Sequence, residues 1–521
     1  MTPVPQLPQT GPQQRPVLPK KRHAPVVGID FGTSYSSVGV VRDGKIEMVR
    51  FEDGEPMLPS VVSFPAPDVV LVGAEARARM GAEAQFTIAS PKRLLGRPFG
   101  DPEVARITGA LAFRSFAGSD RFLRLEAHDR IYSMTDICAM ILEKLRERAK
   151  IHTGQEITEC VMAAPVGFGS LQRSALERAA RQAGMKVLGI LSEPTAAVMA
   201  HGLPKKFNGR VAVYDFGGGT FDFNVLQVSE SAYQVLSSGG DPWLGGDDFD
   251  DLIANHVADA FWRQTEIDLR KRAVEWQALL VECEQAKRTL TKKRSTDVSL
   301  DGLVQMADGA RGLSCRISRK DFNGLTRPLV KRSLAVVERV LNHARLSPQD
   351  VEAVVLTGGT SMIPAVRRAV SKVFGAKPAL ADAHLAVVTG ATIEAANKGG
   401  VELEYKSRMV HEVAGRIFGA SVEGGHVVTL FERDTPLPAE RKESFATLRD
   451  NQQEMVLSLF EQNTSRVDES RPIGKLYLRG LPAAPAGRER IDVTFILDED
   501  GMFTVAANVA GKEYKQSIRT R

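Results

Sequence analysis

One hairpin pattern, which occurs twice, limits the folds open to this chain more than any other feature of its sequence. In residues 211–226 an apolar run reaches Asp215, breaks at a glycine turn and resumes as an alternating run. Residues 26–41 repeat this order, and Asp30-Phe31-Gly32 matches Asp215-Phe216-Gly217. Each copy is typical of a strand, a tight turn and a second strand. Two such hairpins predict two similar lobes that face one nucleotide.

Glycine turns of this kind suit the binding of phosphate. Glycine has no Cβ and tolerates a positive φ, so backbone N–H groups can close around an anion. An acid before the turn and a hydroxyl after it, here Asp215 and Thr220, suit a metal-bound phosphate and a water molecule. Asp-x-Gly turns also occur in ordinary hairpins, which explains one copy without any ligand. The second copy and a third glycine turn, at Gly358-Gly359, favour phosphate binding.

Composition excludes several classes of protein. A chain of 521 residues has room for about two to four domains. The net charge of +5 is small and no basic-aromatic stripe occurs, so no nucleic-acid partner is expected. Four scattered cysteines predict a reducing compartment and no zinc site. No long apolar run or signal peptide is found, so we expect no membrane span and a cytoplasmic location.

The periodicity of the apolar residues changes along the chain. Residues 1–24 are rich in Pro and Gln, which predicts a disordered tail; a targeting or docking role is the alternative. Residues 25–398 alternate strand and helix patterns, which predicts an α/β architecture. Residues 399–410 are interpreted as a linker. Residues 411–521 carry short alternating runs, which predict a second, all-β domain.

Charged residues outside the turns are candidates for the same site, each with a simpler explanation. Lys92, in a basic loop, suits a γ-phosphate but is also explained as one of a surface Lys-Arg pair. Glu193, just before a proline, is either a second site acid or an acid that the helix dipole favours. A single helical stripe is formed by Glu284, Lys287, Arg288 and Thr291, and the sequence alone favours the interpretation of this stripe as a solvated face.

Together these motifs resemble the DnaK, or heat-shock-seventy, chaperone family across residues 26–521. The resemblance begins with the hairpin motif from Gly28 and continues through the central hairpin. The other matching motifs are Lys92-Arg93-Leu94-Leu95-Gly96-Arg97, Glu193-Pro194-Thr195-Ala196-Ala197, Leu244-Gly245-Gly246-Asp247-Asp248-Phe249-Asp250, Glu284-Gln285-Ala286-Lys287-Arg288-Thr289-Leu290 and Asp450-Asn451-Gln452.

The resemblance implies an actin-like (ribonuclease H-like), two-lobed ATPase domain over residues 25–398. A linker and a peptide-binding β-sandwich over residues 411–521 would follow it. The implied activity is slow ATP hydrolysis with ATP/ADP and Mg²⁺, and with K⁺ near Tyr35. The implied role is that of a chaperone in protein folding and the stress response. The implied partners are unfolded or extended polypeptides, a J-domain co-chaperone and a nucleotide-exchange factor.

The resemblance also implies roles for individual residues. Asp30 and Asp215 would orient hydrated Mg²⁺ and the attacking water, and Lys92, Glu193 and Thr220 would complete the hydrolytic site. The phosphates would be bound by Gly32, Thr33, Ser34, Tyr35, Gly217, Gly218, Gly219, Gly245 and Gly246. The adenosine would be held by Glu284, Lys287, Arg288, Thr291, Gly358 and Gly359. Pro165 and Arg173 would relay the nucleotide state between domains, and the peptide pocket would be lined by Phe445, Met455 and Leu457.

Four features depart from the family pattern. The sequence ends at Arg521 after its last strand, so the helical lid is expected to be absent and bound peptide to leave faster. Met362 replaces the usual arginine beside the adenine, and the linker at residues 401–404 alternates acids with apolar residues. Glu423 and Leu448 stand at the peptide-arch positions. An acid there predicts a preference for basic peptides, which a titration with paired acidic and basic peptides would test.

Two other functions are compatible with the pattern. One is a nucleotide-switched interaction module in which hydrolysis or peptide cycling is degenerate; the unusual linker and the expected absence of a lid favour it. The other is an actin-fold kinase of a small molecule, which the all-β C-terminal part disfavours. The complete set of hydrolytic residues favours the ATP-hydrolysing chaperone.

Overall fold

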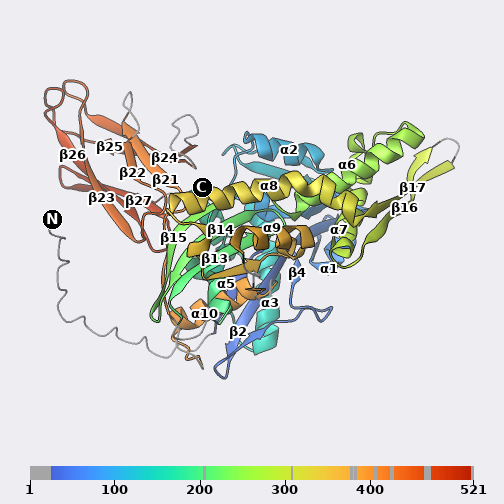
Figure 1. The fold of residues 1–521 in the computed structure, drawn as a ribbon. Helices are drawn as coiled ribbons and strands as arrows, with labels where there is room; N and C mark the ends of the chain where they lie inside the picture. The colour runs from blue at the N-terminus through green and yellow to red at the C-terminus, as the bar shows by residue number, and fades with distance from the viewer. Residues whose placement is uncertain are drawn as a thin grey trace.

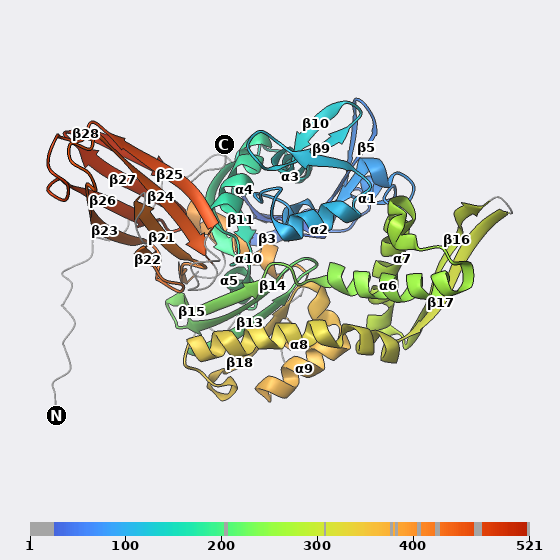
Figure 2. The ribbon, with the colours of Figure 1, turned by 90° about the horizontal axis from the view of Figure 1, so that it is seen from above.

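The computed structural model describes residues 25–202, 207–306, 309–375, 379–380, 384–403, 408–422, 428–462 and 471–517. We refer to residues 25–202 as the first half, to the described residues of 207–411 as the second half and to those of 417–517 as the β segment. Figures 1 and 2 show the β segment at one end, beside the two halves. The α/β class expected from the sequence is confirmed.

The first half is built on a mixed sheet in the order β12-β11-β1-β2-β3, with β4 paired to β2. β1 runs parallel to β11 and antiparallel to β2. The strands are β1 (Val26–Asp30), β2 (Tyr35–Arg42), β3 (Lys45–Met48), β4 (Leu58–Pro59), β11 (Glu159–Ala164) and β12 (Lys186–Ser192).

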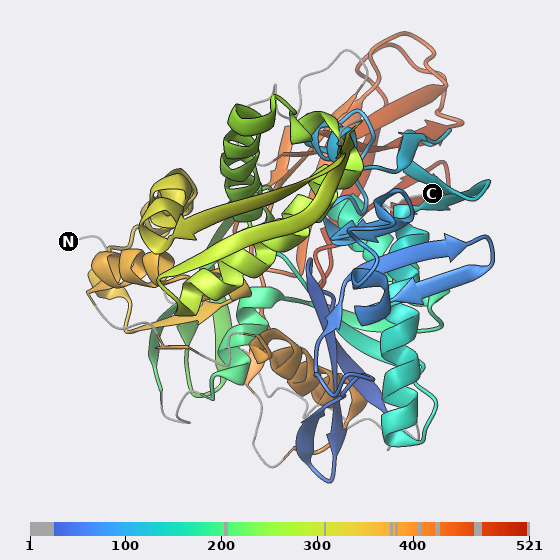
Figure 3. The same ribbon diagram turned by 90° about the vertical axis from the view of Figure 1, so that its right-hand side faces the viewer.

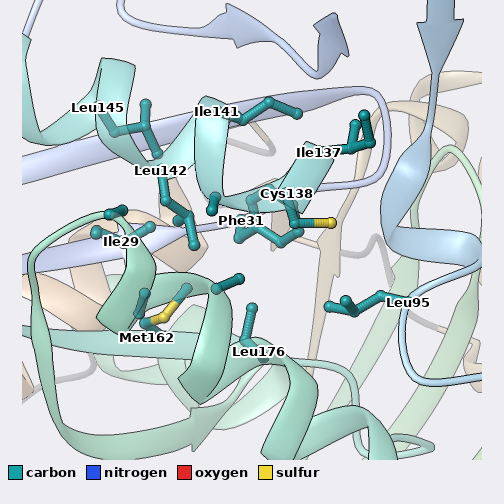
Figure 4. Close-up of a cluster of buried hydrophobic side chains, with 14 of the residues drawn as sticks. Ile29, Phe31, Leu95, Ile137, Cys138, Ile141, Leu142, Leu145, Met162 and Leu176 are labelled. Atoms are coloured by element: carbon teal, nitrogen blue, oxygen red, sulfur yellow. The ribbon is translucent and has the colours of Figure 1, made fainter. Parts of the chain in front are cut away.

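Helices α3 (Met134–Thr153) and α4 (Ser170–Gln182) belong to the hydrophobic core of this sheet. α3 begins at a capping box, in which the Ser133 side chain and Asp136 satisfy each other's backbone N–H groups, and it ends at Gly154 with φ 69°. Figure 4 shows Ile137, Ile141 and Leu145 of α3 near strand and α4 residues such as Met162 and Leu176.

Smaller elements are inserted in the first half between β4 and α3. They form two three-stranded sheets, in the orders β6-β5-β7 and β10-β9-β8. Their bounds are β5 (Val61–Ala66), β6 (Val69–Val72), β7 (Thr87–Ala89), β8 (Arg114–Ala117), β9 (Leu123–Ala127), β10 (Arg130–Ser133), α1 (Ala74–Arg77) and α2 (Pro102–Ala110). Two 3₁₀ turns, η1 (Ala84–Phe86) and η2 (Pro91–Arg93), complete this part.

The second half contains a matching sheet in the order β19-β18-β13-β14-β15-β20. Its strands are β13 (Gly209–Phe216), β14 (Phe221–Val228), β15 (Ala232–Asp241), β18 (Ala353–Thr357), β19 (Ala379–Leu380) and β20 (Met409–His411). The other elements are α6 (Gly246–Thr265), η3 (Leu269–Lys271), α7 (Ala273–Lys292), β16 (Ser295–Met306), β17 (Gly309–Ser318), α8 (Arg319–His343), η4 (Pro348–Asp350), η5 (Gly359–Met362) and α9 (Pro364–Phe374). The β16–β17 hairpin lies nearest the viewer in Figure 3, and the β segment lies farthest.

Two helices, α5 (Glu193–Ala200) and α10 (Ala386–Gly399), connect the two sheets. Their apolar side chains share one core with residues of both sheets, including Val161 of β11 and Val213 of β13. The helices cross closely, since a Cβ on Gly390 would lie 2.0 Å from the Ala196 carbonyl oxygen. This packing fixes the position of one sheet relative to the other.

The β segment consists of two four-stranded antiparallel sheets, β22-β21-β24-β25 and β23-β26-β27-β28. Phe418, Leu457, Phe495 and Phe503 lie in the core that the two sheets share. The strands are β21 (Ile417–Val422), β22 (Val428–Phe431), β23 (Ala439–Ala446), β24 (Glu454–Gln462), β25 (Arg471–Arg479), β26 (Arg490–Leu497), β27 (Phe503–Val509) and β28 (Lys512–Ser517).

The segment interpreted as a linker forms more structure than its sequence suggests. Met409 and Val410 belong to β20, which pairs parallel with β15 at the edge of the second sheet. Glu404 lies outside the described residues, as do the N-terminal tail and the last four residues of the chain.

Candidate functional site

The matching hairpins meet at one cavity of about 520 Å³. The β1–β2 hairpin turns at Gly32, Thr33 and Ser34, and the β13–β14 hairpin turns at Gly217 and Gly218. Most of the predicted site residues line this cavity: Asp30, Gly32, Thr33, Ser34, Tyr35, Lys92, Glu193, Asp215, Gly217, Gly218, Thr220, Glu284, Lys287, Arg288, Thr291, Gly358 and Gly359. Two turns from separate sheets therefore face the same space.

Close packing requires glycine at two positions of the cavity wall. A Cβ on Gly218 would lie 2.0 Å from Ser34 Oγ, so this glycine lets the two turns approach each other. Gly358 has φ 78°, and a Cβ there would lie 2.4 Å from the Phe216 backbone. At these two glycines the backbone can come close to a bound group, which suits an anion.

Gly219, Gly245 and Gly246 are not among the residues that line the cavity. A Cβ on Gly219 would meet Thr33 and Arg93, and one on Gly245 would lie 2.3 Å from the Gly218 carbonyl oxygen. The Gly246 N–H donates to the Gly217 carbonyl over 3.0 Å. Gly219 belongs to the same turn as Gly217 and Gly218, whereas Gly245 and Gly246 contact that turn and support it.

Acidic side chains with raised pKa values collect at this cavity. Burial first, and then the Glu193 carboxylate, raises the pKa of Asp30 to about 7, while Lys92 opposes the shift. Burial and the same glutamate raise the pKa of Asp215 well above its usual value. The negative charge here is thus poorly compensated in the protein alone, and the cluster suits a cation.

Lys92 and Glu193 form a buried ion pair at the cavity. Lys92 Nζ lies 2.6 Å from Glu193 Oε1, and the lysine side chain is 3% exposed. Lys92 belongs to the η2 turn, and Glu193 is the first residue of α5, where Ser192 caps the helix. The pair therefore joins two elements of the first half and holds one positive charge among the acids.

The helix α7 contributes Glu284, Lys287, Arg288 and Thr291 to the lining of the cavity. Glu284 Oε2 lies 2.5 Å from Arg77 of the first half. Lys287 donates to Asp250 over 2.6 Å, and Arg288 donates to the Tyr35 hydroxyl over 3.1 Å. Thr291 donates to the Arg288 carbonyl, and Met362 also lines the cavity.

Asp222 is a member of the acid cluster that sequence reasoning missed. It stands directly opposite Asp215 in the β13–β14 pair and is 3% exposed. Burial and the Glu193 carboxylate raise its pKa to about 8. The cross-strand register of the predicted hairpin was the signal that could have identified it.

The predicted relay residues lie near the junction with the β segment. Arg173 donates to the Asp500 carbonyl over 3.0 Å, and the Asp500 carboxylate accepts from the Ile190 N–H over 2.8 Å. Pro165 is buried just after β11, and its carbonyl accepts from the Phe168 N–H. Asp434 adds further contacts, accepting from the hydroxyls of Ser237 and Ser238.

The predicted peptide-pocket residues lie in the β segment. Phe445, Met455 and Leu457 are 9%, 2% and 0% exposed and belong to its hydrophobic core. Leu448 is 55% exposed at the end of the same sheet that contains Phe445. Glu423 lies outside the described residues.

The donor set fits Mg²⁺ carried by a nucleotide. Among the described residues, no three His, Cys, Asp or Glu side chains are arranged to hold one metal ion directly. Asp30 and Asp215 would contact a magnesium ion that keeps its own waters, and Mg²⁺ commonly binds through one or two carboxylates plus phosphates. The buried acids with raised pKa values fit such a cation.

Two further findings concern the chain as a whole. In the described part, no helix is both long enough and apolar enough to cross a membrane. A family model described as Hsp70 protein matches residues 26–521, which include both hairpins, the cavity and the β segment.

Proposed function

Since the chain belongs to the Hsp70 protein family, we propose that it hydrolyses Mg·ATP in the cavity and couples hydrolysis to reversible binding of extended polypeptide by the β segment. Family membership implies ATP-dependent chaperone function. In this proposal residues 25–398 form an actin-like, two-lobed ATPase domain, residues 399–410 a linker and residues 411–521 a β-sandwich. In the same proposal the protein acts in the cytoplasm, and its partners are a J-domain co-chaperone and a nucleotide-exchange factor.

The observation that carries the proposal is the meeting of two glycine turns, from two separate sheets, at a cavity rich in buried acids. Backbone N–H groups of both turns would hold the phosphates. Asp30 and Asp215 would orient the attacking water, Lys92 would face the γ-phosphate, and Thr220 would supply a hydroxyl. Mg²⁺, when bound, neutralises charge on the phosphates.

Contacts across the junction support the coupling. Arg173 and Ile190 bind Asp500, the Ser170 N–H donates to Glu461 over 3.0 Å, and β20 extends the second sheet. A change in the angle between the sheets would alter these contacts. Binding of peptide and binding of nucleotide would then influence each other reciprocally.

A single-turnover ATPase assay, with and without an unfolded polypeptide, tests the proposal. We expect slow hydrolysis that the polypeptide stimulates. Nucleotide binding without turnover would instead indicate a nucleotide-switched interaction module. Absence of nucleotide binding would contradict both functions.

A further inference from the structure

Arg97 is a buried cation with an incomplete set of partners. Its side chain is 5% exposed, and its Nε has no hydrogen-bond partner among the described residues. Its nearest carboxylate oxygen, Oδ2 of Asp101, lies 3.8 Å from its NH1, too far for a hydrogen bond. Burial, followed by the positive charge of Arg416, lowers the pKa of Arg97 to about 9. The guanidinium is therefore poorly compensated by anions.

Trp243, which belongs to the second half, stabilises part of the positive charge of Arg97. Its ring centroid lies 4.1 Å from the Arg97 guanidinium carbon, which is cation–π distance. Trp243 lies between β15 and α6 of the second half, yet it packs against the hydrophobic core of the first half. The Arg97–Trp243 contact thus joins the two halves that surround the cavity.

Arg471 connects this contact to the β segment. Its NH2 lies 3.1 Å from Asp101 Oδ2, the same oxygen that lies nearest to Arg97. Neither arginine makes a hydrogen bond to that oxygen. One carboxylate is therefore shared by a guanidinium from the first half and one from the β segment. If Arg471 leaves, Asp101 Oδ2 can pair with Arg97, four residues before it, while Oδ1 still accepts from the Glu103 N–H over 3.0 Å.

We propose that Arg471 and Trp243 are positioning residues for the nucleotide: while Arg471 holds Asp101, Arg97 remains stacked on Trp243 and the two halves stay closed around the cavity. Departure of the β segment lets Arg97 turn toward Asp101, which weakens the stacking and favours opening. The inference rests on the proposed function in that a nucleotide must occupy the cavity. Arg93, which pairs with Asp247 over 3.2 Å, and Arg77, which pairs with Glu284, keep further links between the halves, so opening is eased and not complete.

The release rate of a fluorescent ADP analogue from the full chain tests this inference. Arg471→Gln should speed release about threefold, the size expected for losing part of a cation–π contact. Arg471→Lys, which keeps the charge, should restore most of the wild-type rate. Arg479→Gln is the matched control. It also removes a cation from β25, but Arg479 pairs with Glu454 and not with Asp101. It should leave release unchanged.

A double-mutant cycle isolates the coupling between the two residues. Trp243→Leu should also speed release, and adding Arg471→Gln to it should have little further effect. The inference would be overturned if Arg471→Gln released the ADP analogue at the wild-type rate. It would also be overturned if the effects of the two substitutions on the release rate were fully additive in the double variant.

A second measurement requires no nucleotide, so it separates this inference from the proposed function. Arg471→Gln should increase acrylamide quenching of tryptophan fluorescence, and it should not do so in a Trp243→Leu background, where Trp262 and Trp276 remain. Equal quenching in the wild type and Arg471→Gln would contradict the inference. A chain that retains no ADP analogue but shows the quenching change would contradict the proposed function alone.

Discussion

At the residue scale, the acids around the cavity have the most unusual energetics. Asp215 and Asp222 are buried, Asp30 is half-buried, and the Lys92 ammonium lies among them, paired with Glu193. Such a cluster destabilises the protein when it is ionised without a cation, because buried like charges repel and are poorly solvated. The cost is offset when Mg²⁺ and a nucleotide bind. The stability of the nucleotide-free protein should therefore depend on pH.

Asp222→Asn tests this dependence. Its pKa is raised from 3.8 to about 8, so the folded protein binds more protons than the unfolded chain between these values. The free energy of unfolding therefore falls as pH rises through that interval. The asparagine cannot ionise, so the free energy of unfolding of the variant lacks this fall, and one pKa unit corresponds to about 1.4 kcal/mol. Between about pH 5 and about pH 8, the free energy of unfolding of the wild type should therefore fall by at least that much more than that of the variant.

Thermal unfolding of the nucleotide-free protein at both pH values measures the effect. Asp68→Asn is the control, because its side chain is 82% exposed and lies in the turn between β5 and β6, outside the set of residues that line the cavity. It should follow the wild type at both pH values. The account would be contradicted if the wild type and the Asp222→Asn variant lost the same stability between the two pH values.

Residues of the site could be predicted where a local pattern specified them. Asp30, Asp215 and the turn glycines belong to a hairpin signature that can be recognised within a few residues. Asp222 was missed because an acid inside an alternating strand looks like an ordinary outward-facing residue. Arg97 and Trp243 were missed as a pair because their contact depends on how two distant loops pack.

At the element scale, the crossing of α5 and α10 determines how the sheets are placed. The helices cross through small residues, and only glycine fits at residue 390. Apolar periodicity can indicate that a segment such as Ala386–Gly399 is helical. It could not predict the crossing, because the apolar pattern of a helix does not identify its neighbour.

Gly390→Ala should destabilise the protein by about 1–3 kcal/mol, because the new methyl group overlaps backbone atoms of α5 that have no room to move. Chemical denaturation followed by circular dichroism measures this change. Gly324→Ala is the matched control in helix α8, where a Cβ meets nothing within 4 Å. It should be neutral or slightly stabilising, since alanine is the better helix former. Equal effects of both substitutions would contradict the close crossing.

The strand β20 is the element that the sequence did not predict. The alternation in this segment lies at residues 401–404, whereas the residues that pair are Met409–His411, and β20 forms because β15 offers an unpaired edge. The Met409 N–H donates to the Ser231 carbonyl over 2.8 Å, and the Met409 side chain is largely exposed. The backbone therefore holds this strand in place.

Met409→Pro should release β20, because proline has no N–H to donate. We expect faster hydrogen exchange in β15 near Tyr233 and faster proteolysis between α10 and β21. Met409→Ala keeps the N–H and should behave as the wild type. Protection that persists in the proline variant would show that the backbone pairing does not hold β20.

At the scale of the whole molecule, three parts meet around one network of charges. The first half supplies Arg97 and Asp101, the second half supplies Trp243, and the β segment supplies Arg471. The family and the α/β class could be predicted from motifs spread along the chain. The contacts between the parts could not, because they join residues hundreds of positions apart that no local pattern relates.

The central claim is that both hairpin turns act on one Mg·ATP. Single-turnover hydrolysis by the full chain and by Asp30→Asn and Asp215→Asn, with Asp68→Asn as the control, tests it most directly. Each site substitution removes a carboxylate at the cavity that would orient water and metal, so we expect each alone to slow hydrolysis by about 100-fold or more. The control should retain the wild-type rate. A wild-type rate in either site variant would contradict the claim, since one hairpin would then be irrelevant to the chemistry.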